Sequence, residues 1–228
     1  MLTSRIPGVS PTRTSLVQVT GPLSEPISIA TAKSHLRVDF TDDDNLIAGY
    51  ITAAREFCED YTGRAFIAQT FDYTLDDFPR ADMPNAYAVP NTWQTGSGFD
   101  PPNTDISLYL PKSRVASVTS VKYYDANDAL QTIAPSFYQT DFSSTPARLL
   151  PLNNQPWPVT STDMINTVVV RFVASDTVPQ RLVQAALLLI GDWYSNREAD
   201  SGAYQRGSIP APVKSLLDGL RVKGMGII

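Results

Sequence analysis

Residues 41–66 repeat apolar positions with the period of a helix. The apolar members recur at spacings of one and three: Leu46, Ile47, Tyr50, Ile51, Ala54, Phe57, Cys58 and Tyr61. The opposite face carries Asn45, Thr52, Arg55, Glu56, Glu59 and Asp60. Either Thr41 or Asp42 is expected to cap the first amides, because Thr41 and Asp44 have nearly the spacing of a capping box. Gly63 supplies the residue at which such a helix ends.

Three further segments have helical patterns. Residues 26–38 predict a short helix with Ser28 as its cap and with a buried side formed by Ile29, Ala32 and Leu36. Residues 178–198 predict a helix that begins near Pro179 and is apolar on nearly every side over 185–190, so we expect it to be the most buried. The last segment, 211–222, places on one side Val213, Leu216, Leu217 and Leu220.

The middle of the chain has the two-residue period of strands. Residues 70–78 alternate Phe71, Tyr73 and Leu75 with polar neighbours. Residues 115–133 predict two strands joined by a turn at 125–128. Further short strands are expected within 105–110, 136–142, 147–152 and 166–174. Residues 79–104 contain five prolines and show no period, so we expect a long loop.

These elements predict an α+β protein, mainly α, in which a β-rich insertion separates helices two and three. The four helices each carry an apolar side, and a four-helix bundle is the natural packing for them. The expected organisation is an extended N-terminal arm at 1–26, a helical core from 27–69 and 176–222, an insertion at 70–175 and a C-terminal tail at 223–228.

Composition fits a globular protein. The 228 residues are 43% hydrophobic and 18% charged. The net charge of -5 argues against a surface that grips nucleic acid, which requires clustered basic residues. There is no apolar run long enough to cross a membrane and no apolar signal-peptide core. A single cysteine fits a reducing compartment.

Candidate chemistry is sparse, and we predict no enzyme, no catalytic or metal site and no cofactor. Three aspartates at 42–44 have a sufficient explanation as a helix start, where they complement the helix dipole. His35 has no second histidine with which to share a metal, and a surface or capping role suits it better. Cys58 lies on the apolar stripe and is expected in the core. The glycines at 96–98 are not followed by the helix that a phosphate site requires.

One segment has the composition of an interaction site. Residues 191–200 follow an apolar helix and combine aromatic, arginine and other polar side chains, which interface hot spots favour. The members are Trp193, Tyr194, Asn196, Arg197 and Glu198. An alternative is that Trp193 belongs to the core while Arg197 and Glu198 face solvent.

The two helical ends of the chain resemble a known family. Residues 27–37, the acidic helix start at 43–47 and the "YTGRA" at 61–65 are similar to the opening of head-tail connector (adaptor) proteins of tailed bacteriophages, the phage gp6-like or phiE125 gp8-like family. The "VPQRLVQAALLLIGDWYSNRE" and "IPAPVKSLLDGLRV" segments resemble that family's last two helices. The resemblance covers about 27–75 and 176–222.

The resemblance implies a structural virion protein of the neck, present in the host cytoplasm before assembly. Such adaptors form a ring, usually of twelve copies, under the portal protein. The ring leaves a channel through which genomic DNA passes without sequence-specific binding, and it offers a platform to stopper or tail proteins. Contacts between copies are expected at Tyr61 and Arg64 together with Trp193, Tyr194, Asn196, Arg197 and Glu198. Portal docking is expected from Arg221, Lys223, Met225, Ile227 and Ile228, because exposed apolar residues at a terminus suit docking.

Three other functions are alternatives to this interpretation. The first is another neck or tail-completion protein. The second is a carbohydrate- or receptor-binding module that stacks a ligand on Tyr87, Trp93 and Phe99. The third is an unrecognised hydrolase.

Overall fold

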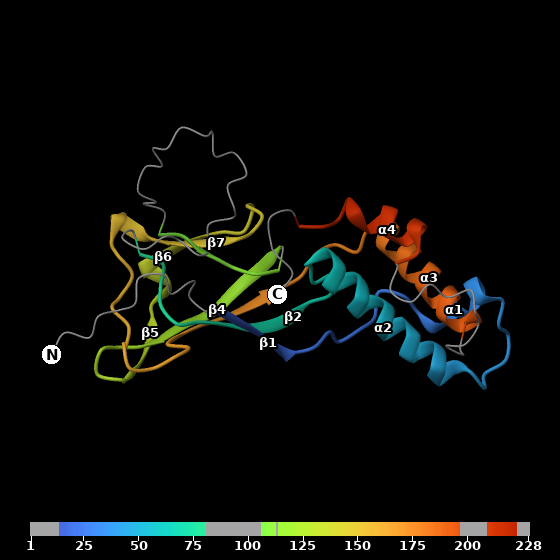
Figure 1. Cartoon of the computed structure of the whole chain (residues 1–228), viewed down its shortest axis with the longest axis horizontal. Helices are drawn as coiled ribbons and strands as arrows, with labels where there is room; N and C mark the ends of the chain where they lie inside the picture. Colours follow the sequence, from blue (N-terminus) through green and yellow to red (C-terminus); the bar gives the residue numbers. More distant parts are fainter. Residues whose placement is uncertain (1–13, 81–105, 113, 197–208, 223–228) are drawn as a thin grey trace. The chain divides into compact units, whose positions relative to one another are not determined.

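The computed structural model describes residues 14–80, 106–112, 114–196 and 209–222. The chain divides into two compact units. The first, called here the strand unit, contains among its described residues 14–19, 70–80, 106–111 and 115–173. The second, the helical unit, contains 20–69, 112, 114, 174–196 and 209–222. Figure 1 shows the ribbon of both, coloured along the chain.

Four helices make up most of the helical unit. They are α1 (Ile29–Leu36), α2 (Asp44–Thr62), α3 (Gln180–Ser195) and α4 (Ala211–Asp218). All four contribute to one apolar core, which includes Ala32 of α1, Ile51 of α2, Ile190 of α3 and Leu217 of α4. The core explains why each helix carries an apolar side, since an isolated helix of eight residues is marginal in water without such packing.

The ends of α1 and α2 follow different rules. Ser28 Oγ accepts a hydrogen bond from Thr31 N at 3.1 Å, so the predicted cap of α1 is confirmed. The cap predicted for α2 is wrong, because the N-cap residue is Asp43 and its side chain makes no capping hydrogen bond. Instead, the Asp43 side chain accepts a hydrogen bond from Tyr194 of α3, and Asp44 Oδ1 lies 2.6 Å from Lys33 Nζ of α1. The other end of α2 is as predicted, with Gly63 in the left-handed conformation at φ 69°.

The predicted buried sides need two corrections. Ile29, expected inside, is 40% exposed, because it stands at the first position of α1. On α2, Leu46 is 37% exposed, whereas two charged residues of the polar face, Arg55 and Glu59, are buried. The segment that follows α2 covers those two residues, as described below. The prediction for α3 agrees with the structure, since most of 185–190 is buried and Leu188 alone of these is more than a third exposed.

Two sheets form the framework of the strand unit. The larger has the order β1-β2-β8-β4-β5, and the smaller has the order β3-β7-β6. Their strands are β1 (Thr14–Thr20), β2 (Gln69–Leu75), β3 (Leu108–Tyr109), β4 (Val115–Tyr124), β5 (Leu130–Ile133), β6 (Tyr138–Asp141), β7 (Arg148–Pro151) and β8 (Val168–Ala174). The pairs β4–β5, β3–β7 and β6–β7 are antiparallel. Among the described residues the protein is therefore a mixed α+β protein with four helices and two sheets.

The larger sheet contains one strand that sequence reasoning missed. Thr14–Thr20 lies in the segment interpreted as an extended arm, yet it pairs with β2 at the edge of the sheet. Val17 and Val19 are about half exposed, so neither face of this edge strand is fully buried. The strand therefore lacks the clear alternation of apolar and polar residues by which the other strands were predicted. By contrast, β2 alternates as predicted, with Phe71, Tyr73 and Leu75 all buried.

An aromatic cluster fills the core on one side of the strand unit. Trp157 stacks on Phe78 with ring centres 4.8 Å apart and also contacts Phe137 and Tyr138. Its indole Nε1 donates to Ile106 O at 2.8 Å, which satisfies the polar end of the ring. The cluster holds together segments on both sides of the residues that the structure does not describe between β2 and β3.

Candidate interaction site

Tyr61, predicted to contact a neighbouring copy, connects α2 to α4 within one chain. Its hydroxyl donates to Asp218 Oδ1 at 2.5 Å. The ring stacks on Phe57 and lies under the Arg221 guanidinium, whose central carbon is 5.7 Å from the ring centre. Cation and aromatic ring attract each other in this arrangement. Arg221, predicted to dock on the portal, is thus placed at the end of α4 beside Tyr61.

The charges around Tyr61 fix which group donates and which accepts. The hydrogen bond from Lys214 and the one from Tyr61 hold the pKa of Asp218 below its ordinary value. In turn, the hydrogen bond to Asp218 raises the pKa of Tyr61, and the same carboxylate raises the pKa of Lys214. At neutral pH, Asp218 is therefore an ionised acceptor and Tyr61 a neutral donor.

Arg64, two residues past the end of α2, also joins segments within one chain. Its Nε donates to Leu220 O at 2.5 Å, and its NH1 lies 2.6 Å from Asp176 Oδ2. Asp176 also pairs with Arg114, whose Nε lies 2.9 Å from Oδ1. The Arg64 side chain is only 19% exposed. It connects the end of α2 to Asp176, in the segment before α3, and to Leu220, just after α4.

The aromatic pair at the end of α3 packs against α2. Trp193 contacts Tyr50 and Phe57, with ring centres 6.1 and 6.5 Å apart. Tyr194 donates its hydroxyl to Asp43 Oδ2 at 2.6 Å. Asn196 is the C-cap of α3, and its side-chain amide donates to Asp192 O at 3.0 Å. These contacts within one chain account for the residue types, and a role between copies stays a prediction.

Several predicted site residues lie outside the part of the chain that the structure describes. They are Arg197 and Glu198 of the interface prediction, Lys223, Met225, Ile227 and Ile228 of the docking prediction, and Tyr87, Trp93 and Phe99 of the stacking prediction. Most of the predicted long loop, 79–104, also lies outside it.

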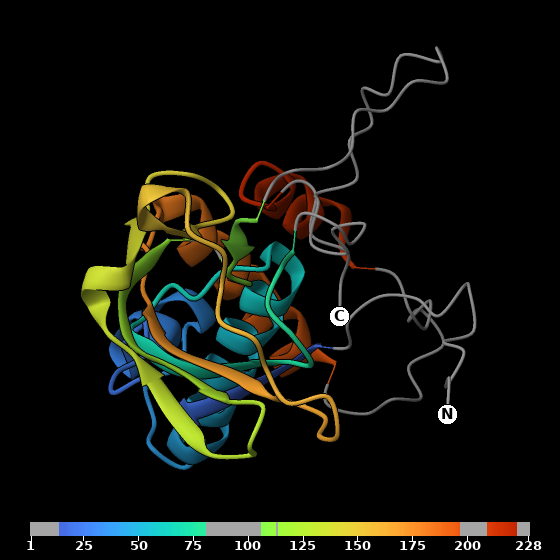
Figure 2. The ribbon, with the colours of Figure 1, turned by 90° about the vertical axis from the view of Figure 1, so that its left-hand side faces the viewer.

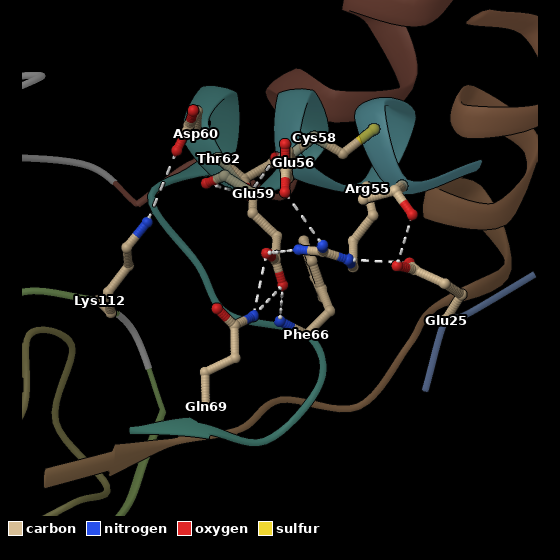
Figure 3. Close-up of polar contacts among 11 residues, drawn as sticks. Glu25, Arg55, Glu56, Cys58, Glu59, Asp60, Thr62, Phe66, Gln69 and Lys112 are labelled. Carbon is tan, nitrogen blue, oxygen red and sulfur yellow. Dashed lines mark hydrogen bonds and ion pairs between the residues drawn. The ribbon is translucent and has the colours of Figure 1, made fainter. Parts of the chain in front are cut away.

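A buried charged cluster on α2 was missed by sequence reasoning. Arg55 NH1 lies 2.8 Å from Glu59 Oε2, and both residues are at most 5% exposed. Glu59 also accepts from Phe66 N at 2.9 Å and from Gln69 Nε2 at 2.8 Å. Arg55 Nε contacts Glu25 Oε2 at 2.9 Å. Figure 3 shows these side chains converging beneath α2.

This cluster, called here the Arg55–Glu59 cluster, fixes the path of the chain as it leaves α2. Burial disfavours the charge of Arg55, but its hydrogen bonds and charge attraction with Glu25 and Glu59 outweigh burial, so its pKa is raised. Glu59 holds the backbone at Phe66 and the side chain of Gln69, the first residue of β2. An opposite pair four residues apart is common on exposed helices, so the pattern alone gives no signal of burial.

The residues that sequence analysis weighed for metal or catalytic chemistry can be placed in the described part of the chain. No group of three or more His, Cys, Asp or Glu side chains in that part of the chain is arranged to hold a metal ion. His35 is exposed and packs over Gly191, where a Cβ would lie only 3.4 Å from His35 Nε2. Cys58 is buried, and burial raises the pKa of its thiol to about 12.

In the described ranges, no helix has both the length and the hydrophobicity to cross a membrane.

The chain is similar to known proteins of virus-like particles. Residues 26–93 match the family described as "Phage gp6-like head-tail connector protein", a range that includes α1, α2 and β2. No curated protein matches the chain. Among solved structures, a chain of the "Virion of native gene transfer agent (GTA) particle" has a TM-score of 0.67 and 21% identity over 93% of this chain and 99% of that one.

Two neck structures match to a similar extent. A chain of the "Neck of empty GTA particle computed with C6 symmetry" gives a TM-score of 0.65 and 22% identity, and one of the "Neck of native GTA particle computed with C12 symmetry" gives 0.61 and 20%. Each match covers 91% of this chain and 95% of the other. The fold is therefore shared along nearly the whole length, helices and sheets together.

Proposed function

We propose that this chain is a structural neck protein of a tailed virion or a related particle, a head-tail adaptor that forms a ring under the portal. The observation that carries the proposal is the fold shared over more than nine-tenths of the chain with components of gene transfer agent particles, two of them necks. The match of residues 26–93 to head-tail connectors supports the same function independently.

A ring is the assembly that this proposal requires. The symmetries named for the two neck particles, C6 and C12, belong to closed rings, and twelve copies remain our expectation for this chain. Tyr61, Arg64, Trp193 and Tyr194 would act by holding the helix ends in place, since each binds within its own chain. Asn196, Arg197 and Glu198 would supply the contacts with the next copy.

The charge of the chain suits a channel that lets DNA pass. Twelve copies with a net charge of -5 each would neutralise few phosphates, so tight binding to the DNA is not expected. The proposed partners are the portal protein on one side of the ring and stopper or tail proteins on the other. The chain would reside in the host cytoplasm before it joins the particle.

Portal docking is proposed for the C-terminal tail, which would begin after Val222. This residue is 5% exposed, and its backbone N donates to Thr62 O at 2.9 Å, so residues up to 222 belong to the fold. Arg221 would contribute a contact from the end of the described fold, and Lys223, Met225, Ile227 and Ile228 would reach the portal. A truncation should therefore remove 223–228 and keep Arg221 and Val222.

The test is electron microscopy of DNA-filled, tailless heads with and without the purified chain. We expect an added ring of density under the portal with the complete chain, and loss of that ring with the chain lacking 223–228. The truncated chain must keep the circular dichroism spectrum of the complete one. Heads that carry an intact portal and gain no density from the folded complete chain would contradict the proposed function.

A further inference from the structure

The larger sheet of the strand unit has an open edge at β5. Within the described chain β5 is the last strand of the order β1-β2-β8-β4-β5. Asp125 N donates to Ala129 O at 3.0 Å, so Asp125 and Ala129 are a hydrogen-bonded pair next to the β4–β5 ladder. Along an antiparallel ladder, hydrogen-bonded and non-hydrogen-bonded pairs alternate. By that alternation Gln131 and Ile133 direct their backbone groups toward β4, and Leu130 and Thr132 direct theirs outward. Such an edge is a template for another strand.

A groove lies beside this edge. It has a volume of about 430 Å³ and is lined by Thr132 and Ile133 of β5 and, further along the chain, by Phe137, Leu152 and Pro158. The lining combines apolar side chains with polar ones, among them Thr132, Ser136 and Gln155. Leu130, at the start of the strand, is 53% exposed. Proteins bind extended segments at an open sheet edge with adjoining pockets, where backbone hydrogen bonds give affinity and the pockets take alternate side chains. Figure 2 shows the yellow-green β4–β5 hairpin at the margin of the strands.

The segment that precedes β1 has the sequence to fill this site. Residues 2–6, "LTSRI", contain no proline and place Leu2, Ser4 and Ile6 on one face of a strand. The two apolar side chains on that face can contact the apolar members of the lining, which include Ile133, Phe137 and Leu152. Residues 7–13 contain two prolines and a glycine and suit a spacer that spans at most about 23 Å.

The charges are complementary. Residues 1–13 carry Arg5 and Arg13 and no acidic residue. The turn that leads into β5 carries Asp125 and Asp128, and their described hydrogen-bond partners are uncharged: backbone amides, Gln131 and Ser161. A basic segment laid along β5 would bring arginine to these carboxylates.

The topology indicates which copy supplies the segment. β1 and β5 are the two opposite edges of one sheet, with β2, β8 and β4 between them. A ring is built from heterologous contacts, in which one surface of a copy meets a different surface of the next. To reach its own β5, the segment would have to cross three strands, roughly 19 Å, with its spacer almost fully extended. In a ring, the β1 edge of one copy can instead face the β5 edge of its neighbour.

We propose that residues 2–6 of each copy add a strand to β5 of the next copy, with Leu2 and Ile6 in the groove beside Thr132. This inference rests on the ring of the proposed function. It predicts that each copy is fastened to its neighbour by backbone pairing in the strand units, in addition to any contact between helices.

Cysteine cross-linking on heads tests the inference. Buried Cys58 is the only native cysteine, so introduced thiols report alone. A chain with both Ser4→Cys and Thr132→Cys, assembled on tailless heads and oxidised, should give a ladder of covalent oligomers on a denaturing gel. A mixture of the two single variants should give dimers, and adding Ile6→Asp to the Ser4→Cys chain should reduce those dimers at least several-fold.

The matched control moves the acceptor thiol away from β5. Ala53→Cys, at an exposed position on α2, should not cross-link to Ser4→Cys. Rings that form without the cross-link, or a double variant that cross-links only within single chains, would overturn the inference and leave the proposed function standing. Absence of rings with the unsubstituted chain would overturn both.

Discussion

The two sides of α2 are both buried, but by different means. On one side Ile47, Ile51 and Ala54 pack into the core shared by the four helices. On the other, Arg55 and Glu59 are enclosed by the chain that follows the helix and by Glu25. Apolar burial is non-directional, so a lost methyl group weakens the core without leaving any group unsatisfied. A buried ion pair depends on every partner, since the loss of one leaves an uncompensated charge.

The largest expected effect comes from breaking the charged side. Glu59→Ala removes the buried carboxylate that pairs with Arg55, whose other described partners, Glu25 and Glu56, are more exposed. It also removes the acceptor of Phe66 N and Gln69 Nε2. We expect the free energy of unfolding of the helical unit to fall by about 3–5 kcal/mol. Urea unfolding followed by far-ultraviolet circular dichroism measures it.

Glu56→Ala is the matched control for that variant. Glu56 also pairs with Arg55, at 3.3 Å, but its side chain is 62% exposed. Its loss should change the free energy of unfolding by less than about 0.5 kcal/mol. Equal effects of the two substitutions would show that burial does not increase the contribution of the Arg55–Glu59 pair to the free energy of unfolding.

The apolar side should respond with a similar or somewhat smaller loss. Leu189 of α3 is 1% exposed in the shared core, and Leu189→Ala should cost about 2–5 kcal/mol through lost burial and the cavity left behind. Leu188, its neighbour in sequence, is 38% exposed. Leu188→Ala should cost less than about 1 kcal/mol in the same urea unfolding. A loss from Leu188→Ala as large as that from Leu189→Ala would contradict the assignment of the core.

The smallest effect concerns a carboxylate that is well hydrogen-bonded but not enclosed. Asp141 Oδ1 accepts from Ser143 Oγ at 2.6 Å and from the backbone amides of Ser143 and Ser144. The Ser143 hydroxyl and the other donors lower the pKa of Asp141 to about 2. Since the folded value lies below the ordinary 3.8, this carboxylate contributes stability above about pH 4, which is lost as the pH falls toward 2.

Ser143→Ala should raise the pKa of Asp141 toward its ordinary value, as measured by nuclear magnetic resonance titration of the side-chain carboxyl. The matched control is Ser144→Ala, because the Ser144 hydroxyl donates to the backbone oxygens of Asp141 and Pro146 rather than to the carboxylate. An unchanged pKa in Ser143→Ala would show that the hydroxyl does not set it. At neutral pH neither variant should unfold the strand unit, in contrast to the effect of Glu59→Ala on the helical unit.

Local signals in the sequence were sufficient where a residue acts on its own neighbours. Ser28 caps the amide of Thr31 three residues away, and Gly63 adopts the left-handed conformation that ends α2. The alternation of Phe71, Tyr73 and Leu75 predicted β2, and the turn at 125–128 predicted the β4–β5 hairpin. Such features depend on backbone geometry within a few residues, which the chain carries wherever it is placed.

The candidate site could be predicted only in part. Trp193 and Tyr194 were singled out from their residue types, and Tyr61 and Arg64 through the resemblance to head-tail connectors. The structure gives each of the four partners that are distant in sequence. Asp218, Asp176 and Asp43 are among those partners, and an isolated aspartate carries no signal of which tyrosine or arginine will meet it. The strand at Thr14–Thr20 was missed for a similar reason, because its pairing with β2 bridges about fifty residues of chain.

The sequence by itself determined the helices, most of the strands and the resemblance to head-tail connectors, since these rest on periodicity and local motifs. Only the tertiary structure decided that Arg55 and Glu59, on the polar side of α2, would be buried. It also decided which partners the aromatic residues at the helix ends would bind, and that β1 and β5 would be the opposite edges of one sheet. The physical reason is that burial and edge position are properties of what covers a residue. The covering segments come from elsewhere in the chain, so a residue's own neighbours in sequence do not specify them.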